Sequence, residues 1–274
     1  MPAELLVALA GLAVLAALVL APWLRGRRRA RQMAAPLDEQ ARLAIERNLP
    51  AARGLPPELR KRLDGLVNAF VAEKQFVGCN GLAVTDEIRA TIAALACLLV
   101  LGRRGHYDEL RSILVYPEAF WVEDEVEDDD GLVTRRRRVL SGEAWEASRI
   151  ILSWDDVLQA AQQPGEGYNV ALHEFAHYLD AEGLGLARTT RSGPTALQDW
   201  ADELVIEFAL LLGAVERGED TFLDPYAAED EAEFFAVATE DYFERPTGLA
   251  DAHPRLYALL REFYGVDPAS WRRT

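Results

Sequence analysis

The sequence predicts an α+β fold: a mostly helical domain with a small mixed sheet, preceded by one N-terminal transmembrane helix. Three observations lead to this prediction. An uncharged apolar run occupies residues 5–24. Apolar residues then recur at helical spacing in several later segments. Two short runs rich in branched apolar residues, S-I-L-V-Y at 112–116 and I-I-L-S-W at 150–154, have the composition of strands.

The apolar run is long enough to cross a membrane, because about 20 helical residues at about 1.5 Å each span a hydrocarbon core of about 30 Å. Arginines follow the run and none precedes it. Since positive residues mark the cytoplasmic side, we expect residues 1–32 to be a single-pass anchor and basic flank in the inner (cytoplasmic) membrane. Residues 33–274 would then form one domain in the cytoplasm. An alanine-rich soluble helix is the alternative, but no polar stripe supports it.

Composition limits the possible functions. Half of the 274 residues are hydrophobic, enough for a sizeable core. The formal net charge of −16 argues against direct binding to nucleic acid. The two cysteines, Cys79 and Cys97, are too few for a disulfide framework, which is typical of a reducing compartment.

The first half of the domain contains two clear helices. Residues 33–52 have the mixed composition of a linker with a helical stretch. An amphipathic helix follows at 56–74. Thr85 is placed to cap the next helix, which has acidic residues in its first turn and stops near Gly102.

Two charged runs lie between the predicted strands. The run at 123–130 is acidic and the run at 135–138 is basic. We interpret them as the two sides of a hairpin tip with opposite charges facing each other. A regulatory or partner-binding loop is the alternative. Further helices are expected at 200–212, 230–243 and 256–264, with a loop over 183–194.

The chemistry of the chain concentrates in H-E-F-A-H at 173–177. On a helix, residues four apart lie on one face, so His173 and His177 can aim at a single ion. Glu174 lies about 100° round the helix, where it can reach a metal-bound water. Two imidazoles, one further protein ligand and one open position are typical of catalytic zinc. Asn169 is an expected N-cap for this helix.

A third ligand must come from elsewhere in the chain. His106 and His253 are expected at the surface. Asp180 shares the face of His173 but lies nearly a turn beyond His177, so it fits a supporting position better. The helix at 230–243 offers several carboxylates, and the candidates are Glu229, Glu231, Glu233, Glu240 and Asp241.

Glu233 stands out among these carboxylates because its neighbours are apolar, and burying an unpaired carboxylate is expensive. Glu240 lies seven residues later on the same helix face, where it can support a ligand from behind. An exposed helix glutamate is the ordinary interpretation of Glu233, and the need for a third ligand argues against it.

At these residues the chain resembles the Mlc titration factor A family of bacterial zinc peptidases. The matching stretches are L-A-C at 95–97, L-V-Y-P at 114–117, S-G-E-A-W at 141–145, I-I-L-S-W at 150–154, H-E-F-A-H-Y-L-D at 173–180 and D-P-Y-A-A-E-D-E-A-E-F-F-A-V at 224–237. The last two also resemble the catalytic domain of anthrax lethal factor. The N-terminal apolar run and the dense acidic run at 123–130 depart from the family pattern.

The resemblance implies a zincin-like metallopeptidase domain over residues 33–274. His173, His177 and Glu233 would bind Zn²⁺, Glu174 would be the general base, and Tyr226 would donate its hydroxyl to the transition state. The substrate would be a peptide or protein, and we expect the strand at 150–154 to be the exposed sheet edge that pairs with it.

The resemblance also leaves other functions open. It implies binding to a transcriptional regulator, so the alternative is a non-catalytic protein that sequesters a repressor. The complete H-E-x-x-H favours chemistry over this alternative, because a pure binding protein does not need Glu174. A structural zinc domain is disfavoured, since such sites usually fill all four positions with Cys or His.

Overall fold

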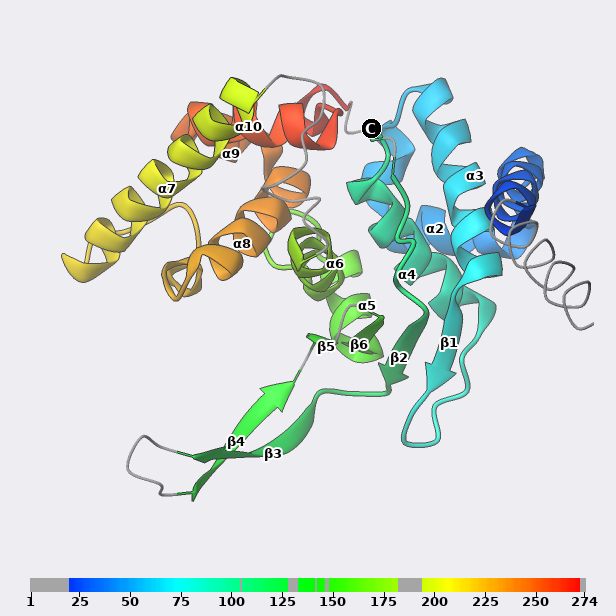
Figure 1. Ribbon diagram of the computed structural model, residues 1–274, viewed down its shortest axis with the longest axis horizontal. Coiled ribbons are helices and arrows are strands. Elements are labelled where there is room, and N and C mark those ends of the chain that lie inside the picture. Colours follow the sequence, from blue (N-terminus) through cyan, green and yellow to red (C-terminus); the bar gives the residue numbers. More distant parts are fainter. Residues whose placement is uncertain are drawn as a thin grey trace, which may run out of the picture.

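The computed structural model describes residues 20–103, 105–127, 133–140, 142–145, 148–181 and 194–271. Most of these residues are helical, and the strands form one four-stranded sheet and one separate hairpin. Figure 1 shows α7 to α10 gathered on one side, α2 to α4 on the other, and α6 between them. Helix α6 contacts both α4 and α8, so it lies at the centre of the molecule.

The N-terminal side consists of a helix over 20–34 followed by α2 (Glu39–Asn48), η1 (Pro50–Gly54), α3 (Pro57–Glu73) and α4 (Asp86–Leu99). The predicted helix at 56–74 is confirmed as α3. The predicted cap of α4 is also confirmed, since the Thr85 side chain accepts a hydrogen bond from Ile88 N at 3.2 Å. The helical stretch expected within residues 33–52 is present as α2, with Asp38 as its N-cap.

The four-stranded sheet has the order β1-β2-β6-β5. Its strands are β1 (Gln75–Gly78), β2 (Ser112–Tyr116), β5 (Gly142–Trp145) and β6 (Arg149–Ser153). The first three in sheet order are parallel, and β5 is antiparallel to β6. Both predicted strands are confirmed, as β2 and β6. The predicted edge is wrong, however, because β6 pairs on both sides and β5 forms that edge.

The second sheet is a hairpin of β3 (Phe120–Glu127) and β4 (Val133–Leu140) that projects away from the helices (Figure 1). Its register pairs Glu123 with Arg137, Asp124 with Arg136, and Glu125 with Arg135. The predicted hairpin with opposite charges across it is therefore confirmed for these pairs. The rest of the acidic run, 128–130, lies outside the described residues.

The remaining elements form the second helical side. Helix α5 follows β6 directly, and the later elements run to the C-terminus: α5 (Trp154–Gln162), α6 (Val170–Ala181), α7 (Pro194–Glu216), η2 (Pro225–Ala228), α8 (Glu231–Glu244), α9 (Pro246–Ala252), α10 (Pro254–Tyr264) and η3 (Pro268–Ser270). The three helices predicted here are confirmed as α7, α8 and α10, although α7 is longer than expected. The expected loop at 183–194 falls mainly on 182–193, outside the described residues.

An aromatic cluster holds the rear of α6 in the core. The ring of Phe175 lies 5.2 Å from that of Tyr107 and 5.9 Å from that of Phe70 on α3, measured between centroids. Tyr107 also contacts Tyr178, and its hydroxyl donates to Ala96 O on α4 at 2.7 Å. Because edge-to-face rings pack closely and specifically, this cluster fixes α6 against both neighbouring helices and leaves its opposite face available for chemistry.

The predicted transmembrane helix at 5–24 requires correction. Within the part of the chain that the structure describes, no helix is both long enough and apolar enough to cross a bilayer. Residues 5–19 lie outside that part, and Leu20–Leu24 continue into the arginine-rich segment as one helix over 20–34. The fold class is corrected to a mostly helical domain with a small sheet. The predicted single-pass location in the inner membrane, with the membrane as a partner, is withdrawn with it.

The described N-terminal helix is tied to the domain by charge and close packing. Arg29 pairs with Glu73 on α3 at 2.6 Å and with Asp108 at 2.8 Å. Gly65 lets the two helices approach, because a Cβ there would lie 2.6 Å from Met33 O. The division of the chain at residue 33 stays a prediction.

Candidate metal centre

Helix α6 begins at a capped N-terminus. The Asn169 side chain accepts a hydrogen bond from Leu172 N at 3.1 Å, as the sequence predicted. Gly167 precedes it with φ +84°, a left-handed conformation that favours glycine. A Cβ at this position would also lie 2.5 Å from the Arg245 guanidinium, which would have to move. The local sequence therefore fixes where the helix starts, and with it the face that His173 and His177 share.

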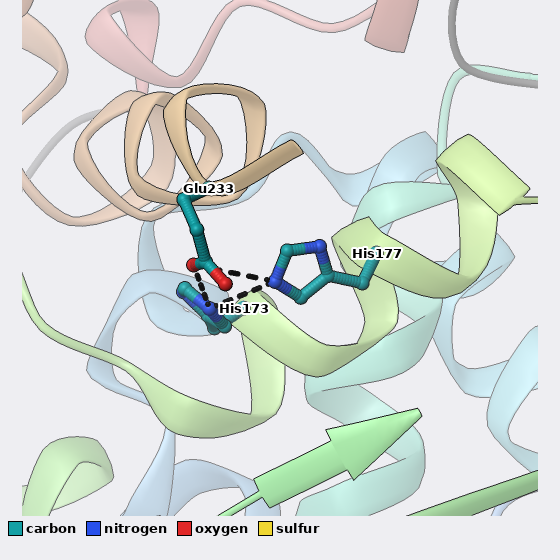
Figure 2. A group of neighbouring side chains, drawn as sticks. All are labelled: His173, His177 and Glu233. Carbon is teal, nitrogen blue, oxygen red and sulfur yellow. Dashed lines mark hydrogen bonds and ion pairs between the residues drawn. The ribbon is translucent and has the colours of Figure 1, made fainter. Parts of the chain in front are cut away.

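Three side chains from two helices converge at one point (Figure 2). His173 and His177 come from α6 and Glu233 from the first turn of α8. His173 Nε2 lies 3.0 Å from Glu233 Oε2, and His177 Nε2 lies 3.5 Å from the same oxygen. The two Nε2 atoms are 3.0 Å apart. Among the described residues, these three form the group that could hold a metal ion.

The geometry of this group fits a tetrahedral ion. Ligand atoms about 2.0–2.1 Å from a tetrahedral zinc lie about 3.3–3.4 Å from one another. The observed separations of 3.0, 3.0 and 3.5 Å bracket that value. Glu233 Oε2 is moreover buried without a hydrogen bond of normal geometry. Burying a carboxylate oxygen without a hydrogen bond costs free energy of folding. A cation at the centre of the group would remove this cost by binding the oxygen.

Electrostatics couples the three side chains. Burial by itself lowers the pKa of His173, but its contacts with Glu233 and Glu240 outweigh this effect and raise the pKa to about 10. Burial would raise the pKa of Glu233, yet the two imidazoles hold that pKa well below its usual range. The metal-free group therefore carries a carboxylate facing a protonated imidazole, and a cation that binds there replaces the proton on Nε2.

Glu240 supports His173 from behind, as its position on the helix predicted. Its Oε1 lies 2.7 Å from His173 Nδ1, and its Oε2 accepts a hydrogen bond from Asn169 N. The side chain is almost fully buried. When Nδ1 donates to this carboxylate, Nε2 keeps its lone pair for a metal and the ring orientation is fixed.

Glu174 and Tyr226 lie beside the group. Glu174 is 6% exposed and close enough to His173 and Tyr226 for its charge to act on both. The Tyr226 ring centroid is 6.2 Å from that of His173, and η2 holds it in place through a 2.9 Å hydrogen bond from Tyr226 N to Asp224 Oδ1. Burial and the nearby carboxylates, Glu233 first, raise the pKa of Tyr226 above its usual value. Its hydroxyl is therefore a proton donor at neutral pH.

The other candidate ligands lie elsewhere. His253 Nδ1 lies 3.1 Å from Glu207 Oε2, and His106 lines a small cavity beside Arg29. Each is partly buried and keeps part of its surface exposed. Neither Asp180 nor Glu229 belongs to the converging group.

Glu244 on α8 did not stand out in the sequence as a site residue. Its Oε1 accepts from Asn169 Nδ2 at 2.9 Å and its Oε2 from Gly165 N at 3.1 Å. The spacing could have revealed it, since 233, 240 and 244 fall on one face of a helix.

Comparison with known proteins agrees with this geometry. The chain is 36% identical to an uncharacterised protein of Synechocystis over 85% of this chain and 86% of that one. It is 35% identical to Mlc titration factor A of Pectobacterium atrosepticum, over 81% and 84% of the two chains, and 35% identical to that of Cronobacter sakazakii, over 85% and 88%. The sequence profile of the glucose-regulated metallo-peptidase M90 family matches residues 23–265. These matches confirm the resemblance seen in the sequence, and the chain belongs to the M90 metallopeptidase family.

Proposed function

We propose that this chain is a zinc-dependent peptidase that hydrolyses peptide bonds with water. The observation that carries the proposal is the convergence of His173 Nε2, His177 Nε2 and Glu233 Oε2 at separations of 3.0–3.5 Å. Two imidazoles and one carboxylate leave a fourth tetrahedral position open, which is the pattern of catalytic zinc in peptidases. Zinc held by these three residues would act as a Lewis acid, lowering the pKa of a water and polarising a carbonyl.

Glu174 is the proposed general base. It directly follows His173 on α6, so it leaves the helix on the side next to the converging group. Its carboxylate is buried and close to both His173 and Tyr226. From this position it can accept the proton of the attacking water and return it to the leaving amine.

Tyr226 is the proposed oxyanion donor. It stays protonated because burial and the nearby carboxylates raise its pKa. It is 45% exposed, so a substrate can reach its hydroxyl. A hydrogen bond to the oxygen that becomes negative during attack lowers the barrier without strengthening ground-state binding.

The substrate would be an extended peptide. Among the described strands, β5 pairs only with β6, so its other edge is available for a further strand. Strand β5 also contacts α6, the helix of the metal group. A peptide that adds to β5 would gain backbone hydrogen bonds while its chain passes close to the converging side chains.

The test compares wild type with Glu174→Gln for zinc content and for cleavage of a peptide library. The amide keeps the size of the side chain but cannot accept a proton from water. We expect both proteins to bind about one zinc, and the variant to lose about 10²–10⁴-fold in rate. If Glu174→Gln cleaves as fast as wild type, the site does not work as a peptidase.

A second candidate function comes from the relatives. Several are named Mlc titration factor A, and this name favours binding to a transcriptional regulator. We propose the same class of partner here as an alternative to catalysis. If the chain is only a binding protein, Glu174→Gln should capture the regulator as tightly as wild type and neither protein should cleave any peptide.

A further inference from the structure

Helix α8 carries three buried or half-buried carboxylates in a line. Glu233, Glu240 and Glu244 are spaced by seven and four residues, which places them on one helix face. Each meets a successive part of the segment 165–177: Glu233 faces the two histidines, Glu240 contacts His173 and Asn169, and Glu244 contacts Asn169 and Gly165. The two segments therefore run antiparallel, joined along their length by carboxylates.

The last of these carboxylates does not touch the metal group. Glu244 is 9% exposed, and both its oxygens accept hydrogen bonds from the segment that precedes α6. Burying a carboxylate is expensive unless its partners are fixed. A neutral residue would give ordinary helix packing at lower cost. The position of Glu244 therefore calls for a reason beyond packing.

Asn169 links Glu244 to the metal group by three contacts. Its Nδ2 donates to Glu244, its Oδ1 caps α6 at Leu172 N, and its backbone N donates to Glu240. Glu240 in turn holds His173 Nδ1 at 2.7 Å. One continuous set of hydrogen bonds thus runs from Glu244 to a ligand on the other helix.

We propose that Glu244 and Asn169 are a positioning pair for the metal site. By fixing the N-terminus of α6 against the end of α8, they set the separation between the histidines on α6 and Glu233 on α8. The proposal rests on the proposed metal site and adds residues that tune its affinity and geometry without contacting the ion. Outer partners of this kind typically change metal affinity by about 10–100-fold.

Substitutions can break the pair without removing either side chain. In Glu244→Gln, one of the two oxygens becomes an NH₂ that must face another donor. In Asn169→Asp, the Nδ2 donor becomes an oxygen that faces Glu244, while the cap on α6 survives because Asp is also a good N-cap. Combining both substitutions restores complementarity, since Gln at 244 can donate to Asp at 169 and accept from Gly165 N.

The fold should survive these changes. The segment before α6 has a second anchor at α8, where Arg245 lies against Gly167 and pairs with Asp241 at 2.5 Å. If Glu244→Gln nevertheless fails to fold, Asn169→Asp alone still tests the pair, because it keeps the helix cap.

The experiment measures Zn²⁺ affinity of the full chain by competition with a chromophoric chelator, and the visible spectrum of the Co²⁺-loaded protein. We expect each single variant to bind Zn²⁺ about 10–100-fold more weakly, with a changed Co²⁺ spectrum. The double variant should return to within about threefold of wild type and recover its spectrum, because the two substitutions act on one contact.

A matched control separates positioning from general destabilisation. Thr239→Val removes a buried 2.7 Å hydrogen bond between Thr239 on α8 and the Tyr264 hydroxyl on α10, which is not part of the set of hydrogen bonds from Glu244 to His173. It should lower the melting temperature but leave Zn²⁺ affinity and the Co²⁺ spectrum unchanged.

Two results would overturn the proposal while leaving the metal site intact: wild-type affinity and spectrum in both single variants, or a double variant no better than the weaker single. Wild type that binds Zn²⁺ no better than His173→Ala would instead refute the metal site itself.

Discussion

The contact between Glu240 and His173 gives a prediction whose magnitude follows from the structure. Glu240 is 2% exposed and uses both oxygens, Oε1 toward His173 Nδ1 at 2.7 Å and Oε2 toward Asn169 N. The substitution Glu240→Gln keeps the size of the side chain but leaves it with one acceptor oxygen. One of the two donors must then face an NH₂ group.

The expected loss is one hydrogen bond to a charged group, worth about 1.5–3 kcal/mol in a buried position. If the amide oxygen stays with the backbone, His173 loses its support and this energy is lost from metal binding. Since 1.4 kcal/mol is a factor of ten, Zn²⁺ should bind about 10–150-fold more weakly. The effect should fall on metal binding, because Nε2 of His173 is no longer held toward Glu233.

The assay is a chelator-competition titration with Zn²⁺, and Glu231→Gln is the control because it makes the same charge change at an exposed position of α8. We expect the control to bind as wild type does. A Zn²⁺ affinity of Glu240→Gln within about twofold of wild type would correspond to a difference of only about 0.4 kcal/mol. That result would show that the Glu240 carboxylate does not orient His173 for metal binding.

Three further predictions concern individual side chains. Glu233→Ala should abolish both zinc binding and cleavage, while Glu229→Ala, at an exposed position nearby, should keep both; wild-type zinc affinity in Glu233→Ala would place the third ligand elsewhere. Tyr226→Phe should keep zinc and fold but lower kcat by about 10²–10³-fold with little change in KM, so an unchanged kcat would exclude an oxyanion role. Phe175→Ala removes a fully buried ring of the aromatic cluster and should lower the free energy of unfolding by about 3–5 kcal/mol in urea denaturation; a loss below about 1 kcal/mol would contradict its place in the core.

The family match and the geometry of the site support different parts of the proposed function. The family match covers most of the chain and supports a peptidase. The separations of the ligand atoms support a tetrahedral metal at these particular residues. Several relatives are named Mlc titration factor A, and this name is the basis of the alternative that we propose, binding to a regulator. Substrate hydrolysis and partner binding are separable by Glu174→Gln, because that substitution changes the base and leaves the surface nearly unaltered.

The local parts of the site could be predicted from the sequence. His173 and His177 share a face because backbone hydrogen bonds fix the helical repeat within a few residues. The Asn169 cap and the strand at 112–116 follow from equally short-range rules, and the structure has both. The hairpin with opposite charges on its two strands could be predicted as well, because an acidic run and a basic run follow one another in the chain. Its register could not be predicted, since several alignments bring opposite charges together.

Other features could not be predicted reliably because they depend on distant contacts. Strand order is one example. We expected β6 to lie at the edge of the sheet, but β5 pairs with it on that side. The four residues of β5 carry little strand pattern of their own, so the sequence did not predict this pairing. Hydropathy over 5–24 suggested a membrane span, but among the residues that the structure describes no helix is long and apolar enough to cross a bilayer.

The metal site also combines features that follow from local sequence with features that depend on distant contacts. By itself the sequence determined that the two histidines and the neighbouring glutamate lie close together, since a single helix presents them at fixed spacing. Apolar neighbours singled out Glu233 in the sequence, but only the tertiary structure decided that this carboxylate, and not another one on or near α8, meets the two histidines. Packing of α8 antiparallel to the segment 165–177 places Glu233, Glu240 and Glu244 where each meets a fixed partner. Their burial is tolerable only in that arrangement, since each carboxylate needs donors or a cation supplied by the other segment.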